Sequence, residues 1–292
     1  MQISGLYTAI ITPFTSGGDI DLDAFRMLVD RQLDGGVDGI VVGGSTGEAA
    51  TMSLDEKRQL WEVAVEHVDG RVPIIAGSGT NDTRSSAKAS KVAQESGARA
   101  LLVVTPYYNK PTPQGLVQHH QAIAEASSLP QILYNVPGRS SLNMSVETQL
   151  AIAEACSTVV ATKEASANLE QISEIIRNAP SSFSVLAGDD NLALPIIALG
   201  GKGVIAVISN YATKTYGSLI RAALAGDVAT ARQLQHQLSP WFAANFLESN
   251  PIPVKYIMHR IAGVGLNYRL PMTPPTDATR AAIDELLPSV PA

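Results

Sequence analysis

Lys163 stands out as a residue that could carry out covalent chemistry. It follows the apolar run over residues 159–162, so its side chain begins at the end of a predicted buried strand. Only a neutral amine attacks a carbonyl carbon, and apolar surroundings disfavour the ammonium form of lysine. This position therefore favours a lysine that forms a Schiff base. The alternative is a lysine that extends to water or pairs with Glu164.

Three hydroxyl-bearing residues are candidates for moving protons beside that lysine. Tyr134 and Tyr108 each stand at the end of a predicted strand, and Ser45 lies in a glycine-rich loop. A phenol can pass a proton between a substrate and water when it is hydrogen-bonded to another hydroxyl. The alternative is that the tyrosines only pack around the mouth of the fold.

Two further features suit a small carboxylate. Residues 43–47 read Gly-Gly-Ser-Thr-Gly, and glycines let backbone N–H groups approach an anion. The loop lacks the lysine of a nucleotide-binding P-loop, so a small carboxylate fits it better than a nucleoside triphosphate. Arg139 follows the predicted rigid turn Pro137-Gly138, and its guanidinium suits a bidentate carboxylate contact. A plain tight turn and a surface arginine are the alternatives.

Eight short apolar runs place these residues at strand ends. Most lack the alternation of half-buried strands, which is typical of parallel strands buried on both faces. Strands are predicted over residues 6–13, 39–43, 72–77, 100–105, 131–135, 159–163, 183–188 and 203–207. Helix-start signals lie between them: the capping box Ser53–Glu56, the pair Thr112-Pro113, and Asp21, Asp82, Ser145, Asn168 and Asp190.

This alternation predicts an α/β protein with a (β/α)8 TIM barrel. An open doubly wound sheet normally has a glycine-rich turn after its first strand, and residues 12–15, Thr-Pro-Phe-Thr, do not form one. The barrel is expected over residues 1–226. A C-terminal helical appendage is expected over residues 227–292, with helices at 228–246, 251–262 and 276–287. Active sites of such barrels lie at the carboxyl ends of the strands, where the residues above are found.

The composition limits the classes of function. The 292 residues are 45% hydrophobic, which supports a large core, and the net charge of -6 argues against a nucleic acid as the main partner. A single cysteine, Cys156, excludes an internal disulfide, and the five histidines show no metal-ligand spacing. Neither a signal peptide nor an apolar run of membrane-spanning length is evident, so a soluble cytoplasmic protein is expected.

Six segments together resemble the dihydrodipicolinate synthase (4-hydroxy-tetrahydrodipicolinate synthase) family. This family belongs to the pyruvate-dependent class I aldolases, which include N-acetylneuraminate lyase. Each segment alone is a weak signal, but their order and spacing cover essentially the whole chain. They are AIITPF at 9–14, GSTGE at 44–48, VTPYYN at 104–109, ILYNVPGR at 132–139, KEA at 163–165 and NPIPVK at 250–255.

The resemblance implies a role for each candidate residue. Lys163 matches the Schiff-base lysine, and Tyr134 matches the proton donor that also contacts the substrate. Ser45 and Tyr108 match the rest of a proton relay, in which the second tyrosine comes from a neighbouring subunit. The remaining matches bind substrate: Thr46 the pyruvate carboxylate, Arg139 the carboxylate of the second substrate, and Gly188 and Ile205 as backbone positions that line the pocket.

The resemblance also implies the reaction and the assembly. It implies a lyase that condenses pyruvate with L-aspartate 4-semialdehyde in lysine biosynthesis through diaminopimelate. The chemistry would use a covalent lysine imine and no metal, nicotinamide or flavin. A homotetramer built from two dimers is expected.

Three departures from the family pattern keep other functions open. Ser45 stands where threonine is usual, and Ser140-Ser141 and residues 208–210, Ile-Ser-Asn, also differ from the common residues. A sibling lyase that cleaves a sugar acid or another 2-keto acid is one alternative, and Arg139 argues against it. A non-catalytic protein that binds a small carboxylate is another, and the combination of lysine, tyrosine and hydroxyl groups argues against it.

The resemblance bears on feedback by L-lysine as well. Lysine-sensitive members tend to carry histidines and a glutamate where this chain has Leu54, Lys57 and Ser85, although Asn81 is retained. A lysine ligand would lose its carboxylate partner and meet an added cation. Weak or absent inhibition is therefore expected, unless Asp82 turns toward the interface and replaces the missing carboxylate.

Overall fold

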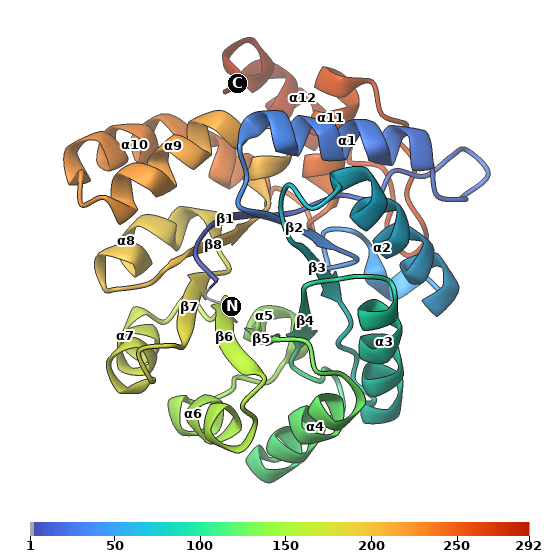
Figure 1. The fold of residues 1–292 in the computed structure, drawn as a ribbon. Coiled ribbons are helices and arrows are strands. Elements are labelled where there is room, and N and C mark those ends of the chain that lie inside the picture. The colour runs from blue at the N-terminus through green and yellow to red at the C-terminus, as the bar shows by residue number, and fades with distance from the viewer. Residues whose placement is uncertain (1–2, 292) are drawn as a thin grey trace.

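The computed structural model describes residues 3–291, which form a closed barrel of eight parallel strands (Figure 1). Each strand pairs with the next along the chain, and the first pairs with the last. The predicted TIM barrel is therefore confirmed. The strands are β1 Gly5–Ala9, β2 Gly39–Val42, β3 Ile74–Gly77, β4 Ala100–Val104, β5 Gln131–Asn135, β6 Val159–Glu164, β7 Ser184–Ala187 and β8 Gly203–Ala206.

The strand bounds differ most from the prediction at β1. The apolar run reaches Pro13, but strand pairing ends at Ala9. The backbone N–H of Ile11 is instead bonded to the side chain of Asn210, at 3.0 Å. Hydrophobicity alone could not locate this end, because residues beyond the strand remain buried under the C-terminal region.

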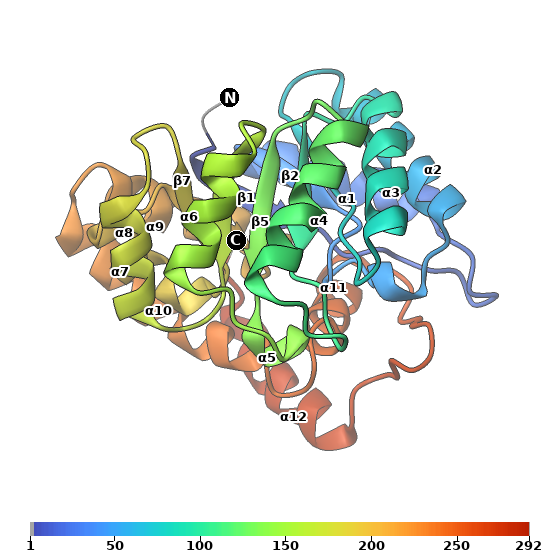
Figure 2. The same ribbon diagram turned by 90° about the horizontal axis from the view of Figure 1, so that it is seen from below.

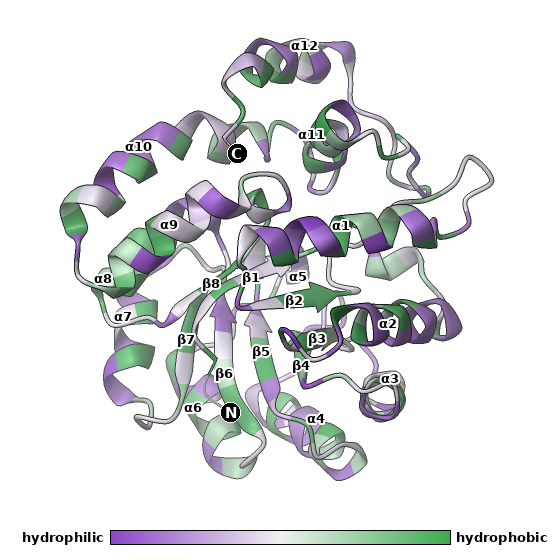
Figure 3. Ribbon diagram, turned by 45° about the horizontal axis from the view of Figure 1, so that its top comes forward, coloured by the Kyte–Doolittle hydropathy of each residue, from purple (hydrophilic) through white to green (hydrophobic). Residues whose placement is uncertain are grey.

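Helices surround the barrel, and most begin at the predicted caps. Figure 3 shows hydrophobic and hydrophilic residues interspersed along these helices, as expected for helices that cover a barrel with one face. Asp21, Ser53, Asp82, Thr112, Ser145 and Asn168 each accept a backbone N–H from the first helical turn. The surrounding helices are α1 Leu22–Gly35, α2 Leu54–Val68, α3 Thr83–Glu95, α4 Pro113–Ala126, α6 Val146–Ala155, α7 Leu169–Asn178, α8 Ala193–Ala198 and α9 Thr213–Leu224.

Two short elements differ from the prediction. The helix predicted to start near Asp190 begins there as the 3-10 turn η2 Asp190–Leu192, which leads into α8, and the Asp190 carboxylate accepts the backbone N–H groups of Val207 and Ile208. The predicted rigid turn at Pro137-Gly138 is the one-turn helix α5 Pro137–Ser140. Both differences lie where a loop crosses the carboxyl end of the barrel, and tertiary contacts decide the local backbone there.

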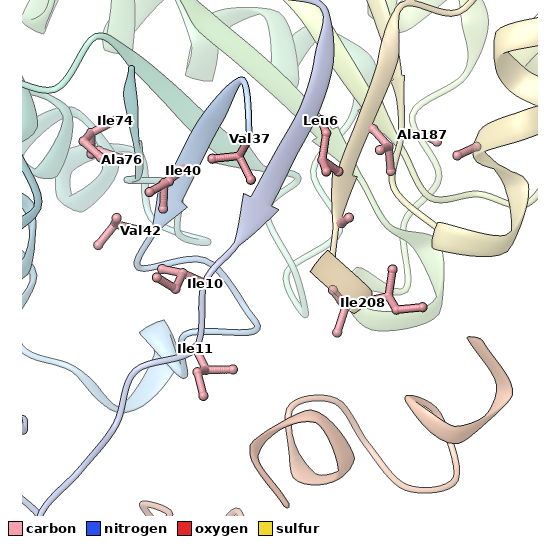
Figure 4. Close-up of a cluster of buried hydrophobic side chains, with 14 of the residues drawn as sticks. Leu6, Ile10, Ile11, Val37, Ile40, Val42, Ile74, Ala76, Ala187 and Ile208 are labelled. Carbon is pink, nitrogen blue, oxygen red and sulfur yellow. The ribbon is translucent and has the colours of Figure 1, made fainter. Parts of the chain in front are cut away.

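The hydrophobic core has two layers. One layer fills the barrel interior and includes Tyr7, Leu102, Ala161 and Ile205. The other lies between the strands and the helices, and Figure 4 shows part of it around β1, β2 and β8. Successive strand residues point to opposite sides, so Lys163, two residues after Ala161, points inward with it.

The C-terminal region forms the predicted helices α10 Val228–Ala244, α11 Ile252–Ala262 and α12 Asp277–Leu286. Figure 2 shows α11 and α12 at the same end of the barrel as α5, which is the carboxyl end of the strands. The region is thus placed to contribute side chains to the site. Among the described residues, no helix is long and apolar enough to cross a membrane.

Candidate active site

A cavity of about 230 Å³ opens at the carboxyl ends of the strands. The loops after β2, β4 and β5 line it together with the C-terminal region. Three predicted site residues, Ser45, Tyr134 and Arg139, are among its lining residues, and so are Asn250, Pro251 and Met272. Residues from distant parts of the sequence thus meet in one cavity, whereas the other predicted site residues are not among those that line it: Lys163, Tyr108, Thr46, Gly188 and Ile205.

Lys163 is not among the lining residues, but it lies next to Tyr134, which is one of them. Its side chain is 5% exposed, and its Nζ atom is 4.3 Å from the centroid of the Tyr134 ring. No carboxylate of residues 3–291 lies within ion-pair distance of it. The alternative in which Lys163 pairs with Glu164 or extends to water is therefore wrong.

Glu164 points to the other side of the barrel wall and fixes the end of β6. It is fully buried, and its carboxylate accepts bonds from Asn135 Nδ2 at 2.8 Å, Gln149 Nε2 at 2.6 Å and Ser166 Oγ at 2.6 Å. A buried charge needs such donors to offset its lost hydration. This arrangement holds the backbone from which Lys163 extends.

Two acidic residues after β7 contribute to the electrostatics around Lys163. Burial raises the pKa of Asp189, and the nearby charge of Lys163 opposes that shift. Burial also raises the pKa of Asp190, to about 6, against the effect of its two backbone N–H donors and of Lys163. Lys163 therefore interacts with these two carboxyl groups without a direct ion pair.

The loop at residues 43–49 is a tight turn that leaves some donors free. The N–H groups of residues 47–49 donate back to the carbonyls of Gly44 and Ser45. Within residues 3–291, the N–H groups of Ser45 and Thr46 donate to no protein acceptor. The loop can therefore be a tight turn and also bind an anion, because the turn uses the N–H groups of residues 47–49 and leaves those of Ser45 and Thr46 available.

A second buried lysine, Lys255, contacts a carboxylate, a carbonyl oxygen and two aromatic rings. Its Nζ atom lies 2.5 Å from Glu48 Oε1 and donates to the carbonyl of Asn267 at 2.6 Å. The rings of Phe14 and Tyr268 have their centroids 4.5 and 4.7 Å from it. Burial lowers the pKa of Lys255, and Glu48 opposes that shift. This ion pair joins α11 to Glu48 within the loop at residues 43–49.

The predicted relay residues are only partly brought together. Tyr108 is 89% exposed with a φ of 73°, and it does not line the cavity, whereas its neighbour Tyr107 does. Within the described chain, no hydrogen bond links the hydroxyl groups of Ser45, Tyr134 and Tyr108. A single chain therefore presents the lysine, one tyrosine and the serine, and directs the second tyrosine outward.

The other predicted binding residues lie around the cavity. Arg139 is exposed on α5, and its Nη2 atom donates to the carbonyl of Asn250 at 3.0 Å. Gly188 donates to the carbonyl of Glu164 at 2.7 Å, and a Cβ atom there would come within 2.6 Å of Ala165 Cβ. Ile205 is buried in the barrel interior with Tyr134. Gly188 and Ile205 lie in the barrel wall rather than in the cavity lining.

Glu48 and Asn250 have no role predicted from the sequence, although both belong to the segments that carry the resemblance. Their contacts span more than 200 residues, as the separation of 204 between Thr46 and Asn250 shows. A polar residue in an otherwise apolar segment, NPIPV, was the available signal. Among the described residues, no cluster of three or more His, Cys, Asp or Glu side chains could hold a metal ion.

The sequence matches known proteins over almost its whole length. The profile of the Dihydrodipicolinate synthetase family covers residues 2–289. A relative from Maridesulfovibrio salexigens, named 4-hydroxy-tetrahydrodipicolinate synthase, is 45% identical over 98% of this chain and 98% of its own. The crystal structure of dihydrodipicolinate synthase from Aquifex aeolicus is similar with a TM-score of 0.96 and 40% identity, covering 98% of each chain. A structure described as the first monomeric dihydrodipicolinate synthase variant has a TM-score of 0.95 and 39% identity, covering 98% of this chain and 96% of its own. With its barrel, its buried lysine and these matches, the chain belongs to the dihydrodipicolinate synthetase family.

Proposed function

We propose that this enzyme is a class I aldolase that condenses pyruvate with L-aspartate 4-semialdehyde, as a 4-hydroxy-tetrahydrodipicolinate synthase in lysine biosynthesis. The observation that carries the proposal is Lys163, a buried lysine without a direct ion pair beside Tyr134. The names of the similar proteins support the substrates. The proposal assigns catalysis to Lys163, Tyr134, Ser45 and Tyr108.

The first half of the reaction makes the nucleophile. The neutral amine of Lys163 attacks the keto carbon of pyruvate, and loss of water gives an iminium ion. The Tyr134 hydroxyl donates and accepts the protons of this dehydration, and the position of its ring beside Lys163 supports that role. Loss of a proton from the methyl group then gives an enamine, with the iminium nitrogen accepting the electron pair.

The second half joins the substrates and frees the lysine. The enamine carbon attacks the aldehyde carbon, and the aldehyde oxygen takes up a proton to become a hydroxyl group. The amine of the former semialdehyde then attacks the imine carbon and displaces Lys163, which closes a six-membered ring. The lysine imine serves as the electron sink, so the proposed chemistry needs neither a metal nor a redox cofactor.

The substrate carboxylates have suitable donors in this site. The free N–H groups of Ser45 and Thr46, with the Thr46 hydroxyl, suit the carboxylate of pyruvate. Arg139 at the cavity edge suits the carboxylate of the semialdehyde, since guanidinium–carboxylate pairs are charge-assisted. Gly188 and Ile205 shape the wall behind the lysine.

We further propose a dimer in which Tyr108 completes the site of the neighbouring subunit, and a tetramer built from two such dimers. An exposed tyrosine with a positive φ is unfavourable for an isolated chain. A second copy of the chain would supply the contacts that make this conformation favourable. Tyr107, next in sequence, lines the cavity of its own chain and is 37% exposed.

An assay of the purified protein with pyruvate and a panel of aldehydes tests the function. L-aspartate 4-semialdehyde should be consumed with the highest kcat/KM, and succinic semialdehyde, which lacks the amine, should not give the cyclic product. Faster release of pyruvate from a sugar acid or another 2-keto acid would favour the sibling lyase instead.

A further inference from the structure

Asn250 connects the two groups proposed to hold the two substrates. Its side-chain Nδ2 donates to Thr46 Oγ1 at 2.9 Å, and its backbone carbonyl accepts a bond from Arg139 Nη2 at 3.0 Å. The residue lines the cavity and is only 5% exposed. One residue of the C-terminal region therefore contacts both predicted carboxylate-binding side chains.

The direction of the bond to Thr46 has a chemical consequence. An amide N–H can only donate, so the threonine oxygen accepts and its single proton must point elsewhere. Within residues 3–291, that hydroxyl donates to no protein acceptor. A carboxylate placed against the free N–H groups of Ser45 and Thr46 would be a suitable acceptor. Asn250 therefore fixes the Thr46 hydroxyl as a donor toward the anion.

The side-chain amide of Asn250 is not explained by a contribution to the stability of the fold. Its other atom, Oδ1, is buried and has no hydrogen-bond partner in the described part of the chain. An unmade bond to a buried acceptor is unfavourable, and an apolar side chain of similar shape would remove that disadvantage. A residue retained only for packing would not need an amide at this position.

We propose that Asn250 is a positioning residue for the pyruvate carboxylate and acts through Thr46. Its backbone carbonyl in addition orients Arg139, and this second contact does not depend on the side chain. The inference rests on the proposed function, because it takes Thr46 as the group that binds pyruvate. Asn250 thereby gives the C-terminal region a specific task in substrate binding, beyond lining the cavity and forming the Lys255–Glu48 ion pair.

Saturation of imine formation with pyruvate tests the proposal without the second substrate. The variants are Asn250→Leu, Asn250→Asp, Thr46→Val and the double variant Asn250→Leu, Thr46→Val, each trapped with borohydride over a range of pyruvate concentrations. Asn250→Leu should raise half-saturating pyruvate roughly ten- to hundredfold, the range for one hydrogen bond to a charged group. Maximal trapping and the melting temperature should stay near those of the wild type.

The other variants separate positioning from structure. Asn250→Asp should raise half-saturating pyruvate further than Asn250→Leu. The new carboxylate would accept the hydrogen bond that the Thr46 hydroxyl otherwise donates to pyruvate, and its charge would repel the pyruvate carboxylate. The double variant should behave like Thr46→Val alone, since the amide acts only through that hydroxyl. In turnover assays, the KM for L-aspartate 4-semialdehyde should change less than twofold in Asn250→Leu, because the carbonyl that holds Arg139 remains.

Each contrary outcome has a distinct meaning. Additive effects in the double variant, or unchanged pyruvate saturation in Asn250→Leu and Asn250→Asp, would overturn the positioning role while the aldolase mechanism stands. If Asn250→Leu fails to fold, Asn250→Asp and Thr46→Val still test the proposal. Both should raise half-saturating pyruvate, and an unchanged value in Asn250→Asp would overturn the positioning role. A wild-type protein that forms no pyruvate-dependent adduct would instead defeat the proposed function itself.

Discussion

The two buried lysines of this chain, Lys163 and Lys255, differ in their charged partners. Lys255 meets Glu48 at 2.5 Å and is held as a cation in an ion pair, whereas Lys163 has no direct carboxylate partner in residues 3–291. Both are at most 5% exposed. Burial alone therefore does not distinguish the two lysines, and the absence of a direct counter-ion is the feature that supports our proposal for Lys163.

Replacing Arg139 should separate the two substrates kinetically. In Arg139→Ala, the KM for L-aspartate 4-semialdehyde should rise about ten- to hundredfold, because a charge-assisted contact of ~1.5–3 kcal/mol is lost. Borohydride trapping with pyruvate should be unchanged, because Lys163 does not depend on the arginine. Arg232→Ala, on the exposed face of α10, is the matched control. Equal loss of trapping in Arg139→Ala would indicate a structural arginine.

L-lysine should inhibit this enzyme weakly or not at all. Lys57 is 9% exposed and pairs with no carboxylate of residues 3–291, and Asp82 already accepts the N–H of Ser85 at 2.8 Å as the cap of α3. The loss of a carboxylate partner costs a cationic ligand ~2–5 kcal/mol. Half-inhibition should lie well above millimolar lysine, and inhibition at submillimolar lysine would contradict the prediction. Lys57→His combined with Ser85→Glu should increase the sensitivity.

At the scale of elements, local chemistry fixed most helix starts and tertiary contacts fixed the rest. Six predicted caps form because a short polar side chain needs only its own first helical turn as a partner. Asp190 was predicted as another helix start and η2 begins there, but its carboxylate accepts N–H groups that lie 17 and 18 residues further along the chain. The sequence around Asp190 does not indicate those distant partners.

A pair of buried histidines joins α3, α4 and β5. His119 Nδ1 lies 2.9 Å from Thr83 Oγ1, and His120 Nδ1 lies 3.0 Å from Gln131 Oε1. Their rings meet edge to face, with centroids 5.3 Å apart. The Nε2 atom of each is buried without a partner in the described chain. Burial lowers the pKa of both, to about 4.

These histidines should make the fold sensitive to acid. The unfolded chain binds a histidine proton near pH 6.5 and the folded chain only near pH 4, so stability is full above pH 6.5 and falls as the pH drops toward 4. For His120 alone the loss is on the order of 3 kcal/mol. Urea unfolding from pH 7 to pH 4 should show a smaller loss in His120→Asn, and the exposed control His236→Asn should match the wild type. Equal pH dependence in all three proteins would contradict this assignment.

At the scale of the whole molecule, the C-terminal region completes the site. The division between barrel and appendage at residue 226 remains our proposal. Contacts cross it at the active site: Thr46 with Asn250, Glu48 with Lys255, and the carbonyl of Thr51 with Arg269 at 3.0 Å. Sequence order predicted the eight strands and the site residues at their ends. It could not predict these pairings, because side chains about 200 residues apart leave no shared periodicity.

The proposed dimer predicts complementation between two defective variants. Lys163→Ala should be inactive and Tyr108→Phe slow. Mixed dimers, purified from coexpression with two different affinity tags, contain one site with both Lys163 and the partner subunit's Tyr108. These dimers should recover about half of the wild-type activity per dimer. Sedimentation should show at least a dimer. Activity no higher than that of Tyr108→Phe, or a fully active monomer, would contradict a tyrosine shared between subunits.

Covalent trapping on Lys163 tests the central claim most directly. Borohydride added together with pyruvate should reduce the imine and leave a stable adduct, which intact-mass analysis detects and peptide mapping assigns to Lys163. Lys163→Ala should give no adduct, whereas Lys255→Arg, which keeps a cation beside Glu48, should still give one. A protein without a pyruvate-dependent adduct, or with the adduct on Lys255, would contradict the mechanism proposed for this enzyme.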